Sequence, residues 1–395
     1  MNTEPISYDE SRELLLVRCK PMAREETLPI TQALGRVLSR NVVAPLPTPR
    51  YNRSAMDGYA VRAIDTKGAR PEHPVKLLVT NTIFPNASPH TEILPTECAR
   101  LCTGSILPPG TDSVVMAEDT ATESNYVLIK TEVAPGNFVS LIGSDIQKGD
   151  LLLEEGTILN PSKIGVLASQ GRAEVEVYAK PVVAVISTGD EIAKVGTELK
   201  DGEIYDINSS ALSALISENG GIPYQLPIAK DDVYSLQTAL RNALIADMVV
   251  ISGGSSVGEK DLIQHVLAKM GEVIFHGIRI KPGQPTAFSM VDDKPVLNMP
   301  GPPTACLMNA YLLVAPALRK IARLPMEGHT VRAKMDYEAK ASHTTKSFPV
   351  ILQGETAIPA LKKSGDILST SKANGYVVIA ENTGSSRGGV LVTMF

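Results

Sequence analysis

The sequence predicts a multidomain protein of the α/β plus β class. The expected parts are a three-layer α/β domain with a parallel-dominated sheet, a β-rich inserted domain, a mixed α/β linker domain and a C-terminal β-barrel-like domain. Three observations predict this. The chain has 395 residues and 43% apolar content, which exceeds the usual size of one hydrophobic core. Apolar strands alternate with helical patterns from residue 180 to 322. Short β-branched runs, separated by proline and glycine, lie on either side of that segment.

The N-terminal segment favours short helices. Residues 8–20 place leucines among charged side chains, which indicates an amphipathic helix, and a second short helix is expected near 28–38. A hairpin followed by a helix that begins at Pro161 is expected between 145 and 171. We therefore expect residues 1–45 and 146–179 to form one mixed linker domain.

A proline-rich run interrupts this linker domain. Three prolines lie between Ala44 and Arg53, in the run APLPTPRYNR, which cannot continue a helix and favours an extended excursion into another domain. From about 60 to 145 the chain shows short alternating or β-branched runs, such as Ser113–Met116 and Tyr126–Ile129. Residues 46–145 are therefore predicted to be a β-rich domain inserted between the two halves of the linker domain.

The next segment, 180–325, is predicted to be the α/β domain. Its strands PVVAVIS, PYQLPIA and DMVVISGG are separated by helical patterns, and this alternation implies parallel pairing with helices on both faces of the sheet. Further strands are expected at 273–280, 286–291 and 295–299, followed by a long helix at 304–322. Residues 326–395 return to short strands and turns, which favours a small β-barrel or sandwich.

Composition excludes several classes of protein. With 21% charged residues and a formal net charge of −5, neither intrinsic disorder nor non-specific binding to nucleic acid is expected. The four cysteines are sparse, which suits a reducing compartment, and Cys98 and Cys102 are interpreted as packing residues and not as metal ligands. No secretory signal and no apolar run of membrane-spanning length is present, so a cytoplasmic protein without a membrane partner is expected.

Candidate ligand-binding loops follow the strands of the α/β segment, because ligands of open α/β sheets bind beyond the carboxyl ends of the strands. Four loops there are rich in glycine, proline or small polar residues: Ser187–Glu191, Ser252–Asp261, Arg279–Pro285 and Met299–Thr304. Each alone is also compatible with a structural turn. Together, on one sheet edge, they favour a phosphorylated ligand, since such loops present backbone N–H groups and hydroxyls to phosphate. Asp261 is either a helix cap or a carboxylate that completes a magnesium shell beside the phosphate.

Two further loops lie in the predicted insertion. The segment Arg53–Ala60 carries one acid among small residues, and Cys102–Gly110 is rich in glycine and proline. By composition alone, both favour plain turns.

As an ordered set, these segments resemble the successive signatures of the MoeA family, which includes the insertase portion of gephyrin. The resemblance spans nearly the entire chain. It is carried by NRSAMDGYAV at 52–61, TGSILPPGTDSVVMAED at 103–119, STGDE at 187–191, GGSSVGEKD at 253–261, KPGQP at 281–285, MPGPPTA at 299–305 and ANGYVVI at 373–379.

The resemblance implies an elongated homodimer with four domains per subunit, in which the linker domain also serves dimerisation. It likens residues 180–325 to the pterin-binding domain shared with MogA and MoaB proteins. The implied reaction inserts molybdate into adenylylated molybdopterin, with Mg²⁺-dependent release of AMP. The implied cleft lies between the α/β domain of one subunit and the β-insertion of its partner, and other molybdenum cofactor assembly proteins are possible partners.

The resemblance also assigns roles to residues. The implied catalytic residues are Asp57, Thr103, Glu191, Asp231 and Asp261. Our own hypothesis adds that Asp261 and Asp231 hold magnesium and that Lys281 neutralises an oxyanion. The implied ligand-binding residues are Ser187, Thr188, Gly189, Ser252, Gly253, Gly254, Ser256, Gly258, Lys281, Gly283, Pro300, Gly301 and Thr304.

Several departures from the family pattern leave two other functions open. Gln284 replaces the usual second lysine of Lys-Pro-Gly-Lys-Pro, and Pro302 replaces the usual asparagine of Pro-Gly-Asn-Pro. A non-catalytic or altered-specificity paralogue that binds pterin or a partner is therefore the alternative to the insertase. A MogA-type adenylyltransferase is less favoured, because the insertion and the C-terminal domain would then be superfluous.

Overall fold

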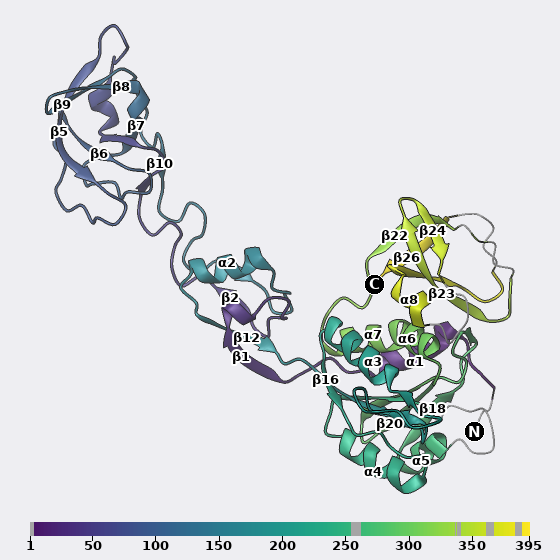
Figure 1. Cartoon of the computed structure of the whole chain (residues 1–395). Coiled ribbons are helices and arrows are strands. Elements are labelled where there is room, and N and C mark those ends of the chain that lie inside the picture. Colours follow the sequence, from purple (N-terminus) through teal and green to yellow (C-terminus); the bar gives the residue numbers. More distant parts are fainter. Residues whose placement is uncertain (1–3, 254–261, 336, 338–340, 361–366, 384–388) are drawn as a thin grey trace. The chain divides into compact units, whose positions relative to one another are not determined.

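The computed structural model describes all residues except 1–3, 254–261, 336, 338–340, 361–366 and 384–388 (Figure 1). It forms two compact units, Met1–Glu26 with Val177–Phe395, and Thr27–Glu176. The chain passes between them within β1 (Glu25–Pro29) and β12 (Glu174–Tyr178). The boundaries of the four expected domains stay predictions.

The unit 27–176 contains a six-stranded sheet in the order β7-β4-β6-β5-β9-β8. Its strands are β4 (Gly58–Val61), β5 (Val75–Ile83), β6 (Glu97–Leu101), β7 (Ser113–Met116), β8 (Thr120–Glu123) and β9 (Tyr126–Ile129). Buried Tyr59, Val115 and Ile129 pack in one core with Cys98, a free thiol, as its interpretation as a packing residue predicted. The β-rich region is thus confirmed.

The rest of this unit consists of short pairs and turns. The pairs are β2 (Val42–Val43) with β11 (Leu151–Leu153) and β3 (Arg53–Ser54) with β10 (Val139–Ser140), and the 3-10 turns are η1 (Ile30–Gln32), η2 (Ala63–Thr66) and η3 (Ala117–Asp119). Helix α2 (Pro161–Ser169) begins where the sequence predicts, with Asn160 accepting a hydrogen bond from the N–H of Lys163.

The second predicted helix, near 28–38, is only the turn η1. Its chain reverses at Gly35, which has a φ of 72° and donates its N–H to the carbonyl of Leu159 at 2.8 Å. Leu38 likewise donates to Thr157 at 2.9 Å. Because these N–H groups bond across to residues 157–159, they are not available for a helical ladder.

The α/β sheet has the order β16-β13-β17-β21-β20-β18. Its strands are β13 (Val182–Ser187), β16 (Ile222–Gln225), β17 (Met248–Ser252), β18 (Glu272–His276), β20 (Ala287–Val291) and β21 (Lys294–Met299). The first four strands in sheet order pair in parallel. The pairings of β21 with β20 and of β20 with β18 are antiparallel. The predicted parallel-dominated sheet is therefore confirmed.

Helices cover both faces of this sheet, as the strand–helix alternation predicts (Figure 1). One face carries α1 (Tyr8–Arg18), α3 (Ile207–Glu218), α6 (Pro303–Asn309), the π-helical turn η4 (Ala310–Val314) and α7 (Ala315–Ile321), and the other carries α4 (Val233–Ala243) and α5 (Leu262–Met270). Side chains of β13 alternate accordingly, since Val185 belongs to the first core and Ile186 to the second.

The C-terminal strands close into a barrel, as predicted. They are β22 (Thr330–Met335), β23 (Thr345–Gln353), β24 (Thr356–Pro359), β25 (Gly375–Ile379) and β26 (Gly389–Met394), and β23 pairs with β25 to complete the ring. The short strand β19 (Ile280–Lys281) of the α/β segment pairs in parallel with β23, and α8 (Ile367–Ser371) contacts α6. Within the described part of the chain, no helix is both long and apolar enough to span a membrane.

Candidate functional site

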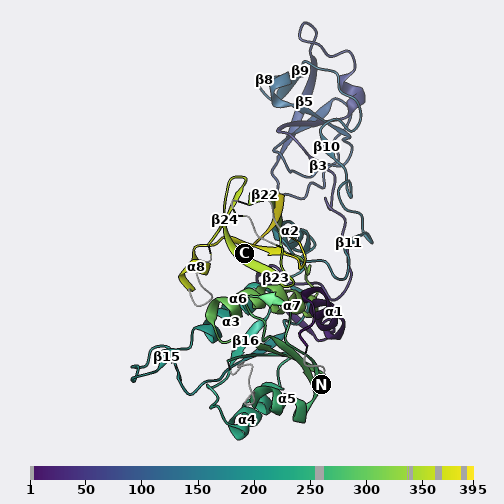
Figure 2. The same ribbon diagram turned by 90° about the vertical axis from the view of Figure 1, so that its right-hand side faces the viewer.

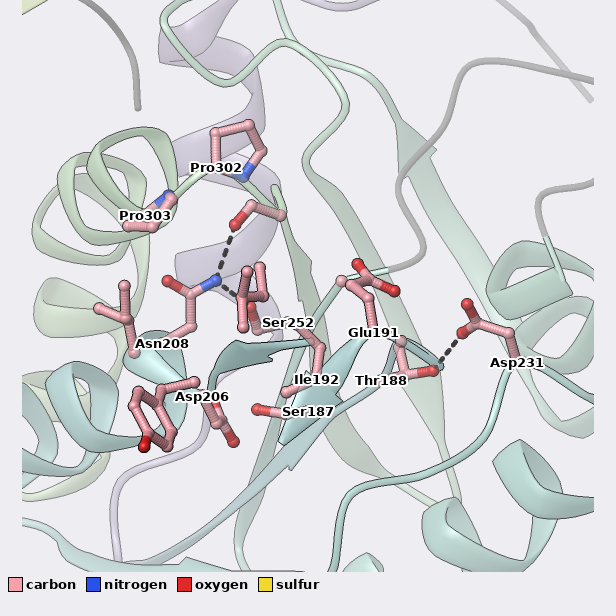
Figure 3. Close-up of a pocket in the computed structure, with 16 residues that line it drawn as sticks. Ser187, Thr188, Glu191, Ile192, Asp206, Asn208, Asp231, Ser252, Pro302 and Pro303 are labelled. Atoms are coloured by element: carbon pink, nitrogen blue, oxygen red, sulfur yellow. Dashed lines mark hydrogen bonds between the residues drawn. The ribbon is translucent and has the colours of Figure 1, made fainter. Parts of the chain in front are cut away.

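A pocket of about 370 Å³ lies at the carboxyl edge of the α/β sheet (Figure 3). It is lined by Ser187, Thr188, Gly189, Glu191, Ile192, Ile204, Tyr205, Asp206, Ile207, Asn208, Asp231, Ser252, Gly253, Gly301, Pro302 and Pro303. Eight of the residues selected from the sequence are therefore brought together: Ser187, Thr188, Gly189, Glu191, Asp231, Ser252, Gly253 and Gly301.

The floor of the pocket is the end of two parallel strands. Ser187 and Ser252 are register partners on β13 and β17, and the N–H of Thr188 donates to the carbonyl of Ser252 at 3.0 Å. The next residue, Gly253, has a φ of 114°, and a Cβ there would lie 2.2 Å from the carbonyl oxygen of Thr188. Only glycine fits where the two strand ends approach so closely.

One side of the pocket is acidic. The hydroxyl of Thr188 donates to Oδ1 of Asp231 at 2.6 Å, and the N–H of Asp231 donates to Oδ1 of Asp190 at 3.4 Å. Glu191 and Asp231 are exposed, and both lie on this side (Figure 3). The arrangement offers carboxylate oxygens to a cation.

The opposite side is built from hydrogen-bonding groups at the start of α3. Nδ2 of Asn208 donates to Oγ of Ser252 at 2.7 Å and to the carbonyl oxygen of Gly301 at 2.8 Å (Figure 3). Asp206 caps the helix by accepting the N–H of Ser209 at 3.0 Å. Sequence reasoning missed Asp206 and Asn208, because it examined only the loops at strand ends and expected the helix to begin after Asn208.

The outer wall is apolar. Ile192 and Ile204 belong to the short parallel pair β14 (Ile192–Ala193) and β15 (Ile204–Tyr205), and both line the pocket with Tyr205. This segment projects beyond α3 and α4 in Figure 2, and Ile204 is 54% exposed. The hydroxyl of Tyr205 donates to the carbonyl of Thr197 at 2.8 Å, so that β15 is linked to the chain that precedes it. A wall of this kind suits the face of a flat ring.

Four other sequence-selected residues lie elsewhere in the same unit. Lys281 is exposed on β19, opposite Lys346 of the barrel. Gly283, with a φ of 100°, packs against Asn309, whose Nδ2 donates to its carbonyl at 2.8 Å. Pro300 and Thr304 are buried, and the Thr304 hydroxyl accepts from that of Thr370 at 3.4 Å. None of the four lines the pocket described above. Gly254, Ser256, Gly258 and Asp261 lie outside the described residues.

Asp57 and Thr103 lie together in the other unit. The N–H and the hydroxyl of Thr103 both donate to Oδ1 of Asp57, at 2.6 and 2.8 Å. These hydrogen bonds hold the pKa of Asp57 below its usual value, with a smaller contribution from the charge of Arg100. The carboxylate is therefore exposed, oriented and ionised.

Replacing Thr103 by valine is expected to raise the pKa of Asp57 toward its ordinary value. The change removes one donor to the ionised form and keeps the backbone donor. The pKa of Asp57 is lower in the folded than in the unfolded protein. The Thr103 hydroxyl therefore stabilises the fold above the unfolded-state pKa of Asp57, and this stabilisation is lost as the pH falls through the folded-state pKa. A ¹³C NMR titration of the aspartate carboxyls measures the shift, and Thr103→Ser, which keeps the hydroxyl, should leave it unchanged. An equal shift in both variants would contradict the role of the hydroxyl.

A parallel-dominated sheet covered on both faces, with a polar pocket beyond its carboxyl ends, defines a ligand-binding protein of the α/β class. Family models described as MoeA N-terminal region (domain I and II), probable molybdopterin binding domain and MoeA C-terminal region (domain IV) match residues 6–171, 184–320 and 315–394. The chain belongs to the MoeA family.

Individual relatives agree over most of the chain. A protein named molybdopterin molybdenumtransferase from Nostoc sp. is 38% identical over 304 residues, which cover 76% of this chain and 70% of the relative. A protein of the same name from Haemophilus influenzae is 31% identical, and the match covers 98% of each chain. A molybdopterin biosynthesis MoeA protein from Pyrococcus horikoshii, known from its crystal structure, has 37% sequence identity to this chain. The two structures superpose with a TM-score of 0.87 over 99% of each chain.

Proposed function

We propose that this chain is a molybdopterin molybdenumtransferase of molybdenum cofactor biosynthesis. It inserts molybdate into adenylylated molybdopterin, with Mg²⁺-dependent release of AMP. Membership of the MoeA family supports the proposal, as do the relatives named for this activity. The single observation that carries it here is the pocket itself, which combines an acidic side at Asp231, a hydrogen-bonding side at Asn208 and an apolar wall.

These three surfaces match the chemistry of the proposed substrate. A pterin or adenine ring is flat and apolar on its faces, and the wall of Ile192, Ile204 and Tyr205 offers such a face a surface. Phosphate groups need hydrogen-bond donors, which the strand ends at Ser187 and Ser252 supply. The acidic side at Asp231 then faces the phosphates across the pocket, where a divalent cation would relieve the repulsion.

The acidic side fits Mg²⁺. This cation takes one or two carboxylates and completes its shell with water and substrate phosphates. Oδ1 of Asp231 accepts from Thr188, and Oδ2 has no hydrogen bond to a described residue, so the carboxylate is oriented with one oxygen available. We assign Asp231 to the cation together with Asp261, which lies outside the described residues. Bound there, Mg²⁺ would polarise the phosphoanhydride and neutralise charge on the leaving AMP.

The remaining roles belong to the same proposal. Glu191, on the acidic side, is a further catalytic carboxylate, and Lys281 neutralises an oxyanion. In a homodimer, Asp57 and Thr103 of a second subunit complete the cleft. The protein works in the cytoplasm, where other cofactor assembly proteins are candidate partners.

The altered-specificity alternative has one specific observation in its favour. Pro302 lines the pocket and precedes α6 without any side-chain capping bond, where the family pattern has asparagine. If that asparagine makes a charge-assisted hydrogen bond to the ligand, its loss costs about 1.5–3 kcal/mol of binding. Gln284 removes a cation from the neighbouring loop in the same way.

A turnover experiment separates the three functions. Purified protein receives adenylylated molybdopterin, Mg²⁺ and molybdate, and AMP is measured with and without molybdate. We expect AMP release that requires both molybdate and Mg²⁺. Adenylylation of molybdopterin from ATP would instead indicate a MogA-type enzyme. Binding of the nucleotide without either reaction would indicate the non-catalytic paralogue.

A further inference from the structure

We propose that Asn208 is a positioning residue that turns the hydroxyl of Ser252 into a fixed hydrogen-bond donor for an oxyanion of the bound ligand. Ser187, on the neighbouring strand, provides a second hydroxyl to the same ligand. This inference rests on the proposed function, because it assigns contacts within the same pocket to a phosphate-type oxyanion.

The orientation of the Asn208 amide is determined by its partners. The carbonyl oxygen of Gly301 can only accept, so the atom 2.8 Å from it is Nδ2. The second proton of that NH₂ group then points at Oγ of Ser252, 2.7 Å away. Asn208 therefore links α3 to the ends of two strands, and Ser252 must accept from it.

A hydroxyl has one proton and two lone pairs, so the rest of the Ser252 hydrogen bonding can be assigned. One lone pair accepts from Asn208, and the other faces the thiol of Cys306, at 3.8 Å. That thiol keeps its proton, because burial raises the pKa of Cys306 to about 12. Because the thiol sulfur is only a weak acceptor, the proton of Ser252 is available to a stronger acceptor, and no described oxygen or nitrogen accepts it. Ser252 is 2% exposed and lines the pocket, so the remaining direction is toward a ligand.

Ser187 points to the same conclusion independently. It is 4% exposed, lines the pocket, and its Oγ has no hydrogen-bond partner among the described residues. A buried hydroxyl without a partner is unfavourable, which indicates that a bound molecule completes it. As register partners on adjacent parallel strands, Ser187 and Ser252 point to the same face of the sheet, about 5 Å apart.

Asp206 limits where the oxyanion can lie. Its carboxylate is on the same side of the pocket as Ser187 (Figure 3), and its Oδ1 already accepts the N–H of Ser209. A negatively charged group is therefore favoured near Ser252 and Asn208, away from Asp206. Ser252 is therefore the main hydrogen-bond donor to the oxyanion, and Asn208 determines the direction in which the Ser252 hydroxyl points.

The test reverses the polarity of the link to Ser252 and removes the hydrogen bond to the Gly301 carbonyl, which a carboxylate cannot make. In Asn208→Asp the side chain accepts, so the Ser252 proton turns toward residue 208 and away from the ligand. An aspartate in the first turn of α3 is compatible with the helix dipole, so the variant should fold. Affinity for AMP with Mg²⁺, measured by calorimetry, should fall about tenfold or more. Asn242→Asp, an exposed position on α4, adds the same charge elsewhere and should bind normally.

A double-mutant cycle separates the positioning effect from simple charge repulsion. If Asn208 acts through Ser252, the loss caused by Asn208→Asp should shrink to about threefold or less when Ser252 is already alanine. Equal losses in both backgrounds would overturn the inference, as would a wild-type protein that does not bind AMP. If Asn208→Asp does not fold, Asn208→Ala takes its place in the cycle. It should also reduce the affinity for AMP less in the Ser252→Ala background than in the wild type.

The proposed function is judged by a different measurement. Molybdate-dependent AMP release together with equal losses in the cycle would refute only the role of Asn208. A cycle that behaves as expected in a protein without that turnover would refute only the proposed reaction.

Discussion

Gly253→Ala is expected to lower the free energy of unfolding by about 3 kcal/mol or more and to abolish ligand binding in the pocket. The residue has a φ of 114°, which is unfavourable for alanine, and the added Cβ would lie 2.2 Å from the Thr188 carbonyl oxygen. Since that oxygen belongs to the backbone of the neighbouring strand end, it can move only if the strand ends separate. Urea denaturation measures the stability, and calorimetry with AMP measures the binding.

Gly301→Ala is the matched control for stability. It lies in the same pocket, has no positive φ, and a Cβ there would meet no atom within 4 Å. Its free energy of unfolding should therefore stay within about 0.5 kcal/mol of the wild-type value. If Gly253→Ala were as stable as Gly301→Ala, the close approach of the two strand ends would not be a constraint on this position.

The fold was largely accessible from the sequence, because its signals are local. Buried parallel strands read as continuous apolar runs, as in PVVAVIS and DMVVISGG, and small polar residues follow them. These signals predict that Ser187 and Ser252 lie at one edge of the sheet. They fail near residues 28–38, where backbone hydrogen bonds to residues 157–159 override a helical pattern.

The site was only partly accessible, because its remaining parts depend on contacts between distant residues. Asn208 looks like an ordinary helix-start residue, and only the folded chain brings it to Ser252 and Gly301. Conversely, Gly283 has the sequence of a ligand loop, yet its carbonyl accepts from Asn309 and its α-carbon packs against that side chain. A glycine in a loop therefore indicates that another group lies close to the backbone, but does not show whether that group is a ligand or a side chain of the protein.

Asp231→Asn is expected to reduce Mg²⁺-dependent AMP release about a hundredfold or more, and to raise the Mg²⁺ concentration needed for half-maximal rate. An amide has one neutral oxygen where the carboxylate has two charged ones, so it is a much weaker ligand for a hard cation. The fold should persist, because Asp231 is exposed and an asparagine oxygen can still accept from the Thr188 hydroxyl.

The neighbouring acid provides the control that makes this result specific. Asp232 caps α4 by accepting the N–H of Ser235 at 2.8 Å and does not line the pocket, and asparagine caps a helix as well as aspartate does. Asp232→Asn therefore removes the same charge one residue away, and its rate and Mg²⁺ dependence should match those of the wild type. If the two variants lost activity equally, the effect would come from the general negative field at this sheet edge. A wild-type Mg²⁺ dependence in Asp231→Asn would remove Asp231 from the cation site and leave the acidic side without its assigned role.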